Sequence, residues 1–284
     1  MTITERDIDV LRVLDRYYVL SRPQIQRLCF PSDTTGRVTR RRLQALVSHD
    51  LISRHRVLVH HPFSAPPGSV YYPAKKGCEL LAEYVDDERH LLTPTQQPQA
   101  HHVPHWLAVS DTHIALDGAI AAQQAVKLAG WINEWDIVNK DESVPEKRFR
   151  LYQLIRESPR LICAPDAAFM LTVQGFSKVF YLEQDRNTTG VRQVAARKSP
   201  GYAAMAERLL HRKHFPETNV DAFTVLLIAP TDRRRDALKK TFREKPQSHV
   251  WKFAAMTDLT PETFLHAPVF HPCAGDPVPL VKSS

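Results

Sequence analysis

The chain has 284 residues, of which 43% are hydrophobic, and it carries a formal net charge of +7 at pH 7. This length allows two modest domains, and the hydrophobic content suffices for packed cores and excludes a disordered chain. The positive charge suits a polyanionic partner such as nucleic acid, although a solvated basic surface would account for it equally well.

Several classes of function are disfavoured by what the sequence lacks. The four cysteines stand far apart without a Cys-x-x-Cys pair, which indicates buried free thiols rather than a zinc site. Glycine is scarce, with nine residues, and neither glycine-rich nucleotide motif occurs, which argues against ATP-driven or dinucleotide chemistry. We find no signal peptide and no apolar run of membrane-spanning length, so we expect a cytoplasmic protein without a membrane partner.

The first 50 residues predict three helices. Thr4 to Asp7 form a near capping box before an apolar stripe at helical spacing that extends to Tyr18. Pro23 suits the first turn of a second, short helix, which Pro31 ends. A third helix is expected from about residue 34 to residue 49.

The third helix has two distinct faces. One face is apolar, and the other is rich in arginine and glutamine. A helix that buries its apolar face can lie in the major groove of DNA, where Arg contacts guanine or phosphate and Gln contacts adenine. The alternative is an ordinary amphipathic helix with a solvated basic face. The apolar face comprises Thr39, Leu43, Leu46 and Val47, and the polar face comprises Arg37, Arg41, Gln44 and Ser48, flanked by Arg40 and Arg42.

Two strands follow, at residues 51–59 and 70–73, joined by a proline-bearing turn at 61–69 and succeeded by a helix near Cys78. Three helices before a two-stranded wing resemble a winged helix-turn-helix domain, and this resemblance implies binding to double-stranded DNA. Basic side chains of the wing would contact phosphates, which gives affinity and orientation without sequence information. The residues expected to bind DNA are Arg37, Arg40, Arg41, Gln44, Arg54, Arg56, Lys75 and Lys76.

The expected domain organisation is a winged-helix domain at 1–85, a linker at 86–104, a second domain at 105–260 and a loose tail at 261–284. The linker is polar and bears three prolines. His101, His102 and His105 stand at its end, where metal ligation and capping or packing are the alternatives.

The second domain begins with an expected helix from Trp106 to about Ala129, which Gly130 ends. The next strand carries Glu134, which either adds a carboxylate to a site or faces solvent. After two further strands, a helix is expected at about 190–212, with a kink or a break at Pro200. An apolar strand, a basic helix and a last strand complete the predicted order.

The segment from Leu161 to Thr189 predicts two adjacent strands, at about 162–173 and 178–185, joined by a turn. Residues two apart on a strand share a face, so Glu183 and Asp185 should point to the same side. Pairing of the strands should bring Asp166 alongside them. Carboxylates this close resist joint ionisation unless a cation lies among them, which indicates a divalent-metal site.

Pro165-Asp166, followed by Glu183-Gln184-Asp185, resembles the motif of the PD-(D/E)xK nuclease-like fold. The longer run from Leu182 to Thr188 resembles the signature of the replication-relaxation family of plasmids and other mobile elements, in which a winged helix precedes a nuclease-like domain. The implied fold class is α+β, with an N-terminal winged helix-turn-helix and a C-terminal α/β PD-(D/E)xK nuclease-like domain. Asn187 stands where the family usually has Gly.

In an active site of this fold, acids hold Mg²⁺ or Mn²⁺ and a lysine positions the attacking water. The resemblance assigns the metal to Asp166 and Glu183, but Asp185 stands where an active nuclease has lysine. Lys198 is the candidate replacement, so the expected catalytic set is Asp166, Glu183, Asp185 and Lys198. Its place before Tyr202 resembles a Lys-to-Tyr spacing of the family.

The leading hypothesis is a DNA-binding protein of a mobile element, acting in the control of replication, mobilisation or excision. Its second domain would hold DNA or a partner. The alternatives are a metal-dependent DNA endonuclease and a dimeric transcriptional repressor, so enzymatic activity stays open at this point. The expected partners are double-stranded DNA, a second copy of the chain, and other DNA-processing proteins of the same element.

Overall fold

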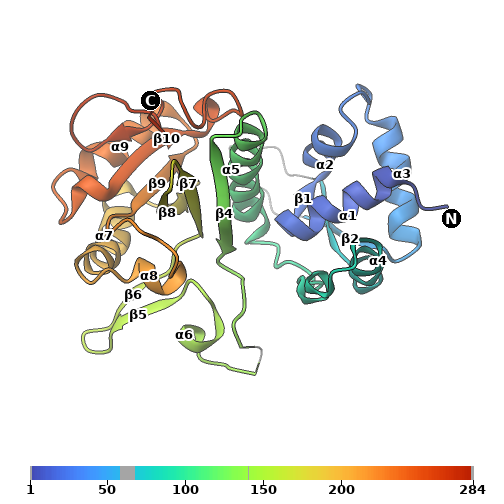
Figure 1. Cartoon of the computed structure of the whole chain (residues 1–284), viewed down its shortest axis with the longest axis horizontal. Helices are drawn as coiled ribbons and strands as arrows, with labels where there is room; N and C mark the ends of the chain where they lie inside the picture. The colour runs from blue at the N-terminus through green and yellow to red at the C-terminus, as the bar shows by residue number, and fades with distance from the viewer. Residues whose placement is uncertain (1, 58–67, 140, 283–284) are drawn as a thin grey trace. The chain divides into compact units, whose positions relative to one another are not determined.

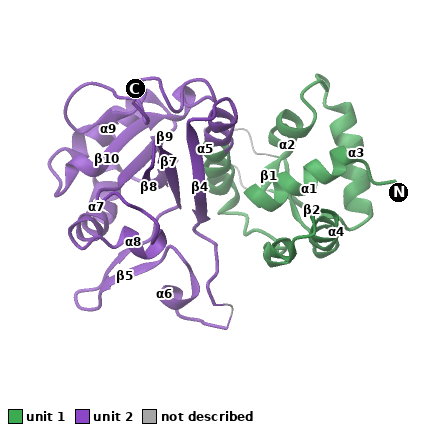
Figure 2. Ribbon diagram, viewed as in Figure 1, with its two compact units in different colours: residues 1–113 green, residues 114–284 purple. Residues whose placement is uncertain are grey.

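The computed structural model describes residues 2–57, 68–139 and 141–282, and its helices and strands form a mixed α+β chain, as predicted (Figure 1). The chain divides into two compact units, residues 1–113 and 114–284 (Figure 2). The division falls inside helix α5, which runs without a break from Val103 to Ala121. Among the described residues, none of the helices combines the length and the hydrophobicity that a bilayer crossing requires.

The described part of the first unit contains four predicted helices, a predicted pair of strands, and a two-residue strand that the sequence pattern did not indicate. The three strands form an antiparallel sheet in the order β1-β3-β2. The predicted turn at 61–69 falls largely outside the described residues. The elements are α1 (Glu5–Tyr17), β1 (Leu20–Ser21), α2 (Arg22–Cys29), α3 (Arg37–Ser48), β2 (Ile52–Arg56), β3 (Ser69–Pro73), α4 (Lys75–Val85) and the short helix η1 (Glu88–Leu92).

The predicted capping box of α1 is confirmed, and it also joins α1 to α3. The Asp7 carboxylate is buried, and it accepts hydrogen bonds from the Thr4 backbone N–H at 2.8 Å and from Arg42 Nε at 3.0 Å. Burial would raise the pKa of Asp7, but the hydrogen bonds from Arg42 and Thr4 outweigh it and lower the pKa. This carboxylate therefore stabilises the fold above its ordinary pKa, and the contribution is lost as the pH falls through the lowered value.

The second unit is built on a six-stranded sheet in the order β11-β10-β9-β8-β7-β4. Strands β4, β7 and β8 pair antiparallel, whereas β8, β9 and β10 are parallel. Its elements are the second half of α5, β4 (Val126–Asn133), α6 (Pro145–Arg148), β5 (Gln153–Arg156), β6 (Leu161–Cys163), β7 (Ala167–Val173), β8 (Phe176–Gln184), α7 (Val191–Glu207), α8 (His211–His214), β9 (Thr224–Ala229), α9 (Asp232–Phe242), η2 (Ser248–Val250), β10 (Trp251–Ala255), η3 (Met256–Asp258) and β11 (His271–Pro272).

Helices α7 and α9 cover one side of this sheet, and the second half of α5 lies on the other side (Figure 1). Beneath α7 and α9 the core is aromatic. Tyr202 of α7 and Phe242 of α9 both contact the ring of Trp251 on β10, with centroids 5.0 and 4.4 Å apart. This core fixes α7 over β8, where the predicted acidic residues lie.

Three boundary predictions in the second unit are wrong. Gly130 does not end a helix; it lies inside β4 at an irregularity of the pairing with β7, where an added Cβ would stand 3.2 Å from Phe215. The strand expected at 162–173 is split, because Pro165 cannot donate to a strand ladder, and β6 pairs with β5 instead. The tail after residue 260 is not loose, since Phe264 and Phe270 are buried and β11 pairs with β10.

Pro200 does not break α7, which stays helical from Val191 to Glu207. The next residue, Gly201, packs directly on the β6 backbone: an added Cβ would stand 2.6 Å from the carbonyl oxygen of Ile162 and 3.1 Å from Cys163 Cβ. This close approach holds the middle of α7 against the sheet.

We expect Gly201→Ala to destabilise the second unit by about 2 kcal/mol, because overpacking against rigid backbone forces the helix to shift. Thermal unfolding followed by circular dichroism measures the effect. The matched control is Gly190→Ala, where no atom lies within 4 Å of the added Cβ, and we expect a change below about 1 kcal/mol. Equal losses in the two variants would contradict the close approach.

Candidate functional site

Asp166 and Glu183 lie side by side at the ends of β7 and β8. The register pairs Ala167 with Leu182, so the residues next to this pair are neighbours across the two strands. The Gln184 backbone N–H donates to Asp166 Oδ2 at 2.7 Å. Both carboxylates are largely removed from solvent, with side-chain exposures of 13% for Asp166 and 5% for Glu183.

Helix α7 supplies a cation and a hydroxyl to this pair. Lys198 Nζ lies 2.5 Å from Glu183 Oε2 and 3.7 Å from Asp166 Oδ1, and it donates to the Ala164 carbonyl at 3.2 Å. Tyr202, one helical turn further on, donates its hydroxyl proton to Glu183 Oε1 at 2.6 Å. Residues four apart share a helix face, and because α7 continues through Pro200 both side chains reach the same carboxylate.

The surroundings of Glu183 raise the pKa of its carboxyl group to near neutral pH. Burial raises the pKa of Glu183 to about 7; Asp166 adds to the rise, and Lys198 and Tyr202 oppose it. Burial by itself would lower the pKa of Lys198, but Glu183 and Asp166 outweigh burial and raise it. Lys198 is therefore charged at neutral pH, while Glu183 exchanges a proton there.

Asp185 stands apart from this cluster. Arg234 of α9 binds it through two hydrogen bonds, Nε to Oδ2 at 2.7 Å and Nη2 to Oδ1 at 2.9 Å. Glu183 and Asp185 do face the same side, as the strand period predicts. However, helix α7 supplies the partners of Glu183, whereas helix α9 supplies the partner of Asp185. The prediction that three carboxylates share one cation is therefore wrong for Asp185. Nothing in the spacing of the basic helix singles out Arg234 as its partner.

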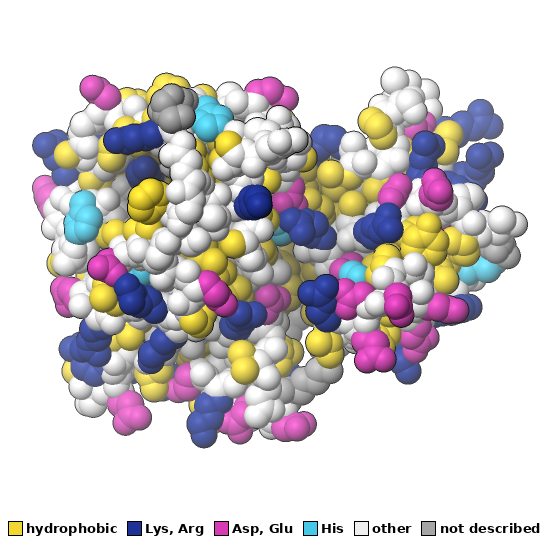
Figure 3. All heavy atoms as spheres, in the orientation of Figure 1, with side chains coloured by type: hydrophobic (Ala, Val, Ile, Leu, Met, Phe, Trp, Pro, Cys, Tyr) yellow, Lys and Arg dark blue, Asp and Glu magenta, His cyan; other side chains and the backbone are white. Residues whose placement is uncertain are grey.

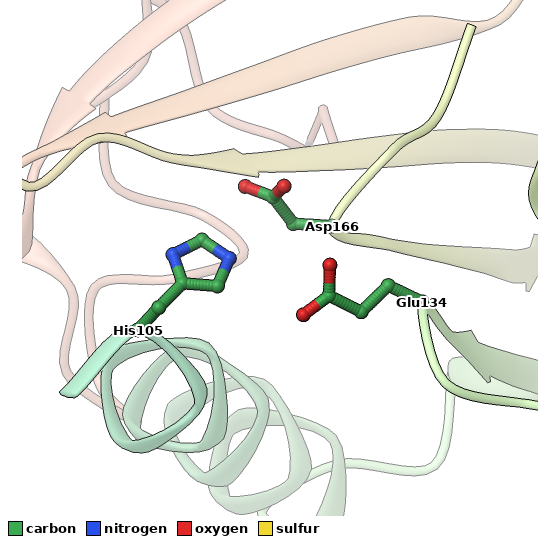
Figure 4. A group of neighbouring side chains, drawn as sticks. All are labelled: His105, Glu134 and Asp166. Atoms are coloured by element: carbon green, nitrogen blue, oxygen red, sulfur yellow. The ribbon is translucent and has the colours of Figure 1, made fainter. Parts of the chain in front are cut away.

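A second group meets at Asp166. One ligand atom each from His105, Glu134 and Asp166 lie within 4.8 Å of one another, and all three residues are half-buried. The imidazole comes from the first turn of α5, and the two carboxylates come from the ends of the neighbouring strands β4 and β7 (Figure 4). Of the two alternatives expected for Glu134, a carboxylate added to a site and a solvent-facing side chain, the structure therefore favours the first. Glu183 is not part of this group.

The first unit contains a basic groove of about 1050 Å³, formed by α2, α3, the strands β2 and β3 and the first half of α5. Alternation along β2 puts Arg54 and Arg56 on one face, opposite Tyr71 and Ser69 of β3. Side chains four apart on α3 line the facing wall. The charged and amide side chains that line the groove are Arg22, Gln24, Arg27, Arg40, Gln44, Arg54, Arg56 and Asp111.

Four of the eight residues expected to bind DNA line this groove: Arg40, Gln44, Arg54 and Arg56. The others do not. Arg37 and Arg41 are exposed on α3 beside it, and Lys75 and Lys76 are exposed at the start of α4. On the face shown in Figure 3, Lys and Arg side chains gather over α3.

Two arginines of the groove, Arg22 and Arg27, were not among the predicted DNA-binding residues, because their short helix was assigned only a structural role. Arg27 Nη2 pairs with Asp111 Oδ1 at 2.8 Å, which compensates its charge at one edge of the groove. A signal was present, because the face of α2 opposite its buried Ile25 is polar.

Comparison with known proteins adds one finding. A family model described as replication-relaxation matches residues 11–218, which is more than half of the chain and includes the groove, the Asp166–Glu183 pair and Lys198. No curated protein and no solved structure matches the chain. The chain therefore belongs to the replication-relaxation family.

Proposed function

We propose that the protein binds double-stranded DNA through the groove of its first unit and acts in the replication or mobilisation of a mobile genetic element. The family match supports the biological setting. The order α1-β1-α2-α3-β2-β3 and the antiparallel β1-β3-β2 sheet are typical of a winged helix-turn-helix domain. The observation that carries the proposal is the groove itself, which presents five arginines and one aspartate.

The groove combines the two kinds of contact that DNA recognition needs. Arg22, Arg54 and Arg56 lie on the flanking elements, where guanidinium groups neutralise phosphates and orient the duplex. Arg40 and Gln44 lie on one face of α3 and suit hydrogen bonds to base edges in the major groove. Affinity would therefore come from several elements, and sequence preference from α3.

Fluorescence anisotropy with a labelled duplex, titrated at several salt concentrations, tests this proposal. If the three flanking arginines neutralise phosphates, the logarithm of the association constant should fall with the logarithm of salt concentration with a slope of about −3. The stoichiometry of the complex tests the expected homodimer in the same titration. Binding that is absent at low salt, or that does not depend on salt, would overturn the proposal.

A second candidate function, metal-dependent DNA cleavage, is favoured by Lys198. It places a cation beside Asp166 and Glu183, although Asp185 occupies the usual lysine position. The two carboxylates suit Mg²⁺ or Mn²⁺, because these ions prefer oxygen ligands. A bound divalent ion would polarise the scissile phosphate, and Lys198 would orient the attacking water. The second unit would then be a PD-(D/E)xK nuclease-like domain acting on DNA that the first unit holds.

Incubation with supercoiled plasmid and Mg²⁺ or Mn²⁺ distinguishes cleavage from binding alone. A nuclease should nick or linearise the plasmid, and Asp166→Ala should abolish cutting while duplex affinity stays within about twofold, since Asp166 lies outside the groove. Intact plasmid that is still retarded on a gel would remove the nuclease candidate and leave a DNA-binding regulator.

A further inference from the structure

We propose that Lys178, Lys252 and Lys282 form a binding site for a phosphate group on the second unit. The phosphate belongs either to a free anion such as pyrophosphate or to the backbone of a nucleic acid, since both present the same kind of oxygen. This inference goes beyond DNA binding by the groove of the first unit and does not rest on it. It is also independent of the family match, because Lys252 and Lys282 lie beyond residue 218.

Lys178 and Lys252 lie on the same face of the six-stranded sheet. Strands β8, β9 and β10 are parallel, and their register aligns Leu182, Leu226 and Lys252 across the three strands. Lys178 precedes Leu182 by four residues on β8, and residues at even separations along a strand share a face. Both lysines therefore lie on the face that carries Leu182 and Leu226.

The second half of α5 lies on the same side of the sheet as the two lysines. The alternate residues of β8 and β10, Val179 and Trp251, belong to the core beneath α7 and α9. The lysines are on the opposite side, which is the side of α5 (Figure 1). The chain after β10 also comes to this side, because an added Cβ on Gly118 of α5 would stand 2.9 Å from Pro261 Cγ.

A third lysine comes from the segment after β11. The Val281 backbone N–H donates to the carbonyl of the buried Leu265 at 2.9 Å, which fixes the chain immediately before Lys282. Burial lowers the pKa of Lys252 to about 8, and the charges of Lys178 and Lys282 contribute to this shift. The three ammonium groups, from three separate elements, therefore lie near one another.

The three ammonium groups lack a counter-charge within the part of the chain that the structure describes. None of them pairs with a carboxylate there. Lys178 Nζ lies 5.6 Å from the centroid of the Phe180 ring, which compensates its charge only in part. Like charges that are close and half-buried resist joint ionisation unless an anion lies among them. Because Lys282 is exposed, an anion can reach the cluster from solvent.

Phosphate suits this cluster better than a carboxylate does. A free phosphate carries more than one negative charge at neutral pH and a nucleic acid presents successive phosphates, whereas a carboxylate has one charge on two oxygens. An ammonium group has three hydrogens and acts as a point charge, so lysines bind phosphate without the planar geometry that arginine requires. Three lysines from different elements can therefore surround one phosphate group.

Protection from acylation tests the site in the full-length protein. Lysines are labelled with acetic anhydride and the modified positions are read by mass spectrometry, with sodium pyrophosphate or a short DNA duplex as the probe at constant ionic strength. We expect labelling of Lys178, Lys252 and Lys282 to fall at least about threefold with one of the probes. Lys240, an exposed lysine of the same unit, should be labelled equally with and without the probe.

The two probes distinguish the two sources of phosphate. Protection by pyrophosphate identifies a site for a free anion, and protection by the duplex alone identifies a site for the nucleic-acid backbone. If neither probe protects the three lysines, or if Lys240 is protected equally, the proposal is overturned. This readout needs no variant, and duplex affinity of the groove is measured separately, so its failure leaves the DNA-binding proposal standing.

A matched pair of variants tests whether the three lysines act together. Lys252→Met keeps the apolar stem and removes the charge, so the probe concentration that half-protects Lys178 should rise about tenfold. Lys240→Met removes the same charge outside the cluster and should leave that concentration within about twofold. Equal shifts in the two variants would mean that the probe responds to net charge, which would overturn the site. Circular dichroism confirms that both variants are folded.

Discussion

Replacing Arg40 and Arg54 together by alanine is expected to lower the affinity for duplex DNA by about two orders of magnitude at moderate salt. The two residues come from different elements, α3 and β2, and both line the groove. A hydrogen bond to a charged group contributes roughly 1.5 kcal/mol or more, which is about tenfold in affinity for each arginine. Because Arg54 is the member of the pair assigned to a phosphate, the slope of the salt dependence should also fall by about one.

The matched control is the double variant Lys75→Ala/Lys76→Ala, which removes the same charge from the same unit. Both lysines are exposed and lie outside the groove. We expect its affinity to stay within about threefold of the unchanged protein. A similar loss in both double variants would mean that DNA responds to the overall charge of the unit, and the groove would lose its assigned role.

Lys198→Met is expected to destabilise the second unit by about 3 kcal/mol at pH 8. Removing one partner of a buried ion pair leaves the other charge uncompensated, which typically costs about 3 to 5 kcal/mol. The partial exposure of Lys198 (32%) places the effect at the lower end. Methionine keeps most of the apolar stem, so the loss reports on the charge rather than on packing.

The loss should depend on pH, because burial raises the pKa of Glu183 to about 7. A carboxyl group with a raised pKa in the folded state contributes most stability at low pH, and this contribution declines as the pH rises through that pKa. Removal of Lys198 raises the pKa of Glu183 further, so the stability lost between low and high pH becomes larger. The destabilisation by Lys198→Met should therefore be clearly smaller at pH 5.5 than at pH 8.

Urea unfolding followed by tryptophan fluorescence measures the destabilisation at pH 5.5 and at pH 8, since Trp131, Trp135 and Trp251 lie in the second unit. Adding Glu183→Gln to Lys198→Met removes the uncompensated charge and should recover at least half of the loss at pH 8. Arg197→Met, at the exposed neighbouring position of α7, should change stability by less than about 0.5 kcal/mol. A loss that is equal at both pH values, or that Glu183→Gln does not reduce, would contradict the assigned ion pair.

The sequence by itself determined those features that depend on neighbours in the chain. The Thr4–Asp7 box begins α1, and the spacing of Thr39, Leu43 and Leu46 defines the buried face of α3. Gly175 marks the hairpin turn, where its φ of 84° suits glycine. The period of two along paired strands, set by that turn, already brings Asp166 and Glu183 together.

Lys198 was predicted from the family resemblance, in which the lysine of the motif is relocated to the helix after the hairpin, and not from its spacing to the acidic pair. Whether the helix continued past Pro200 was not decided by local preference, because proline in a helix interior usually breaks it. The packing of Gly201 on β6 and the burial of Tyr202 accompany the continuous helix.

Only the tertiary structure decided which distant side chains meet. Arg42 pairs with Asp7, 35 residues away, and Arg234 with Asp185, 49 residues away, although each arginine stands in a run of similar residues. Local periodicity states which face a residue occupies, but the packing of apolar faces selects the element opposite it, and that selection is a property of the whole fold.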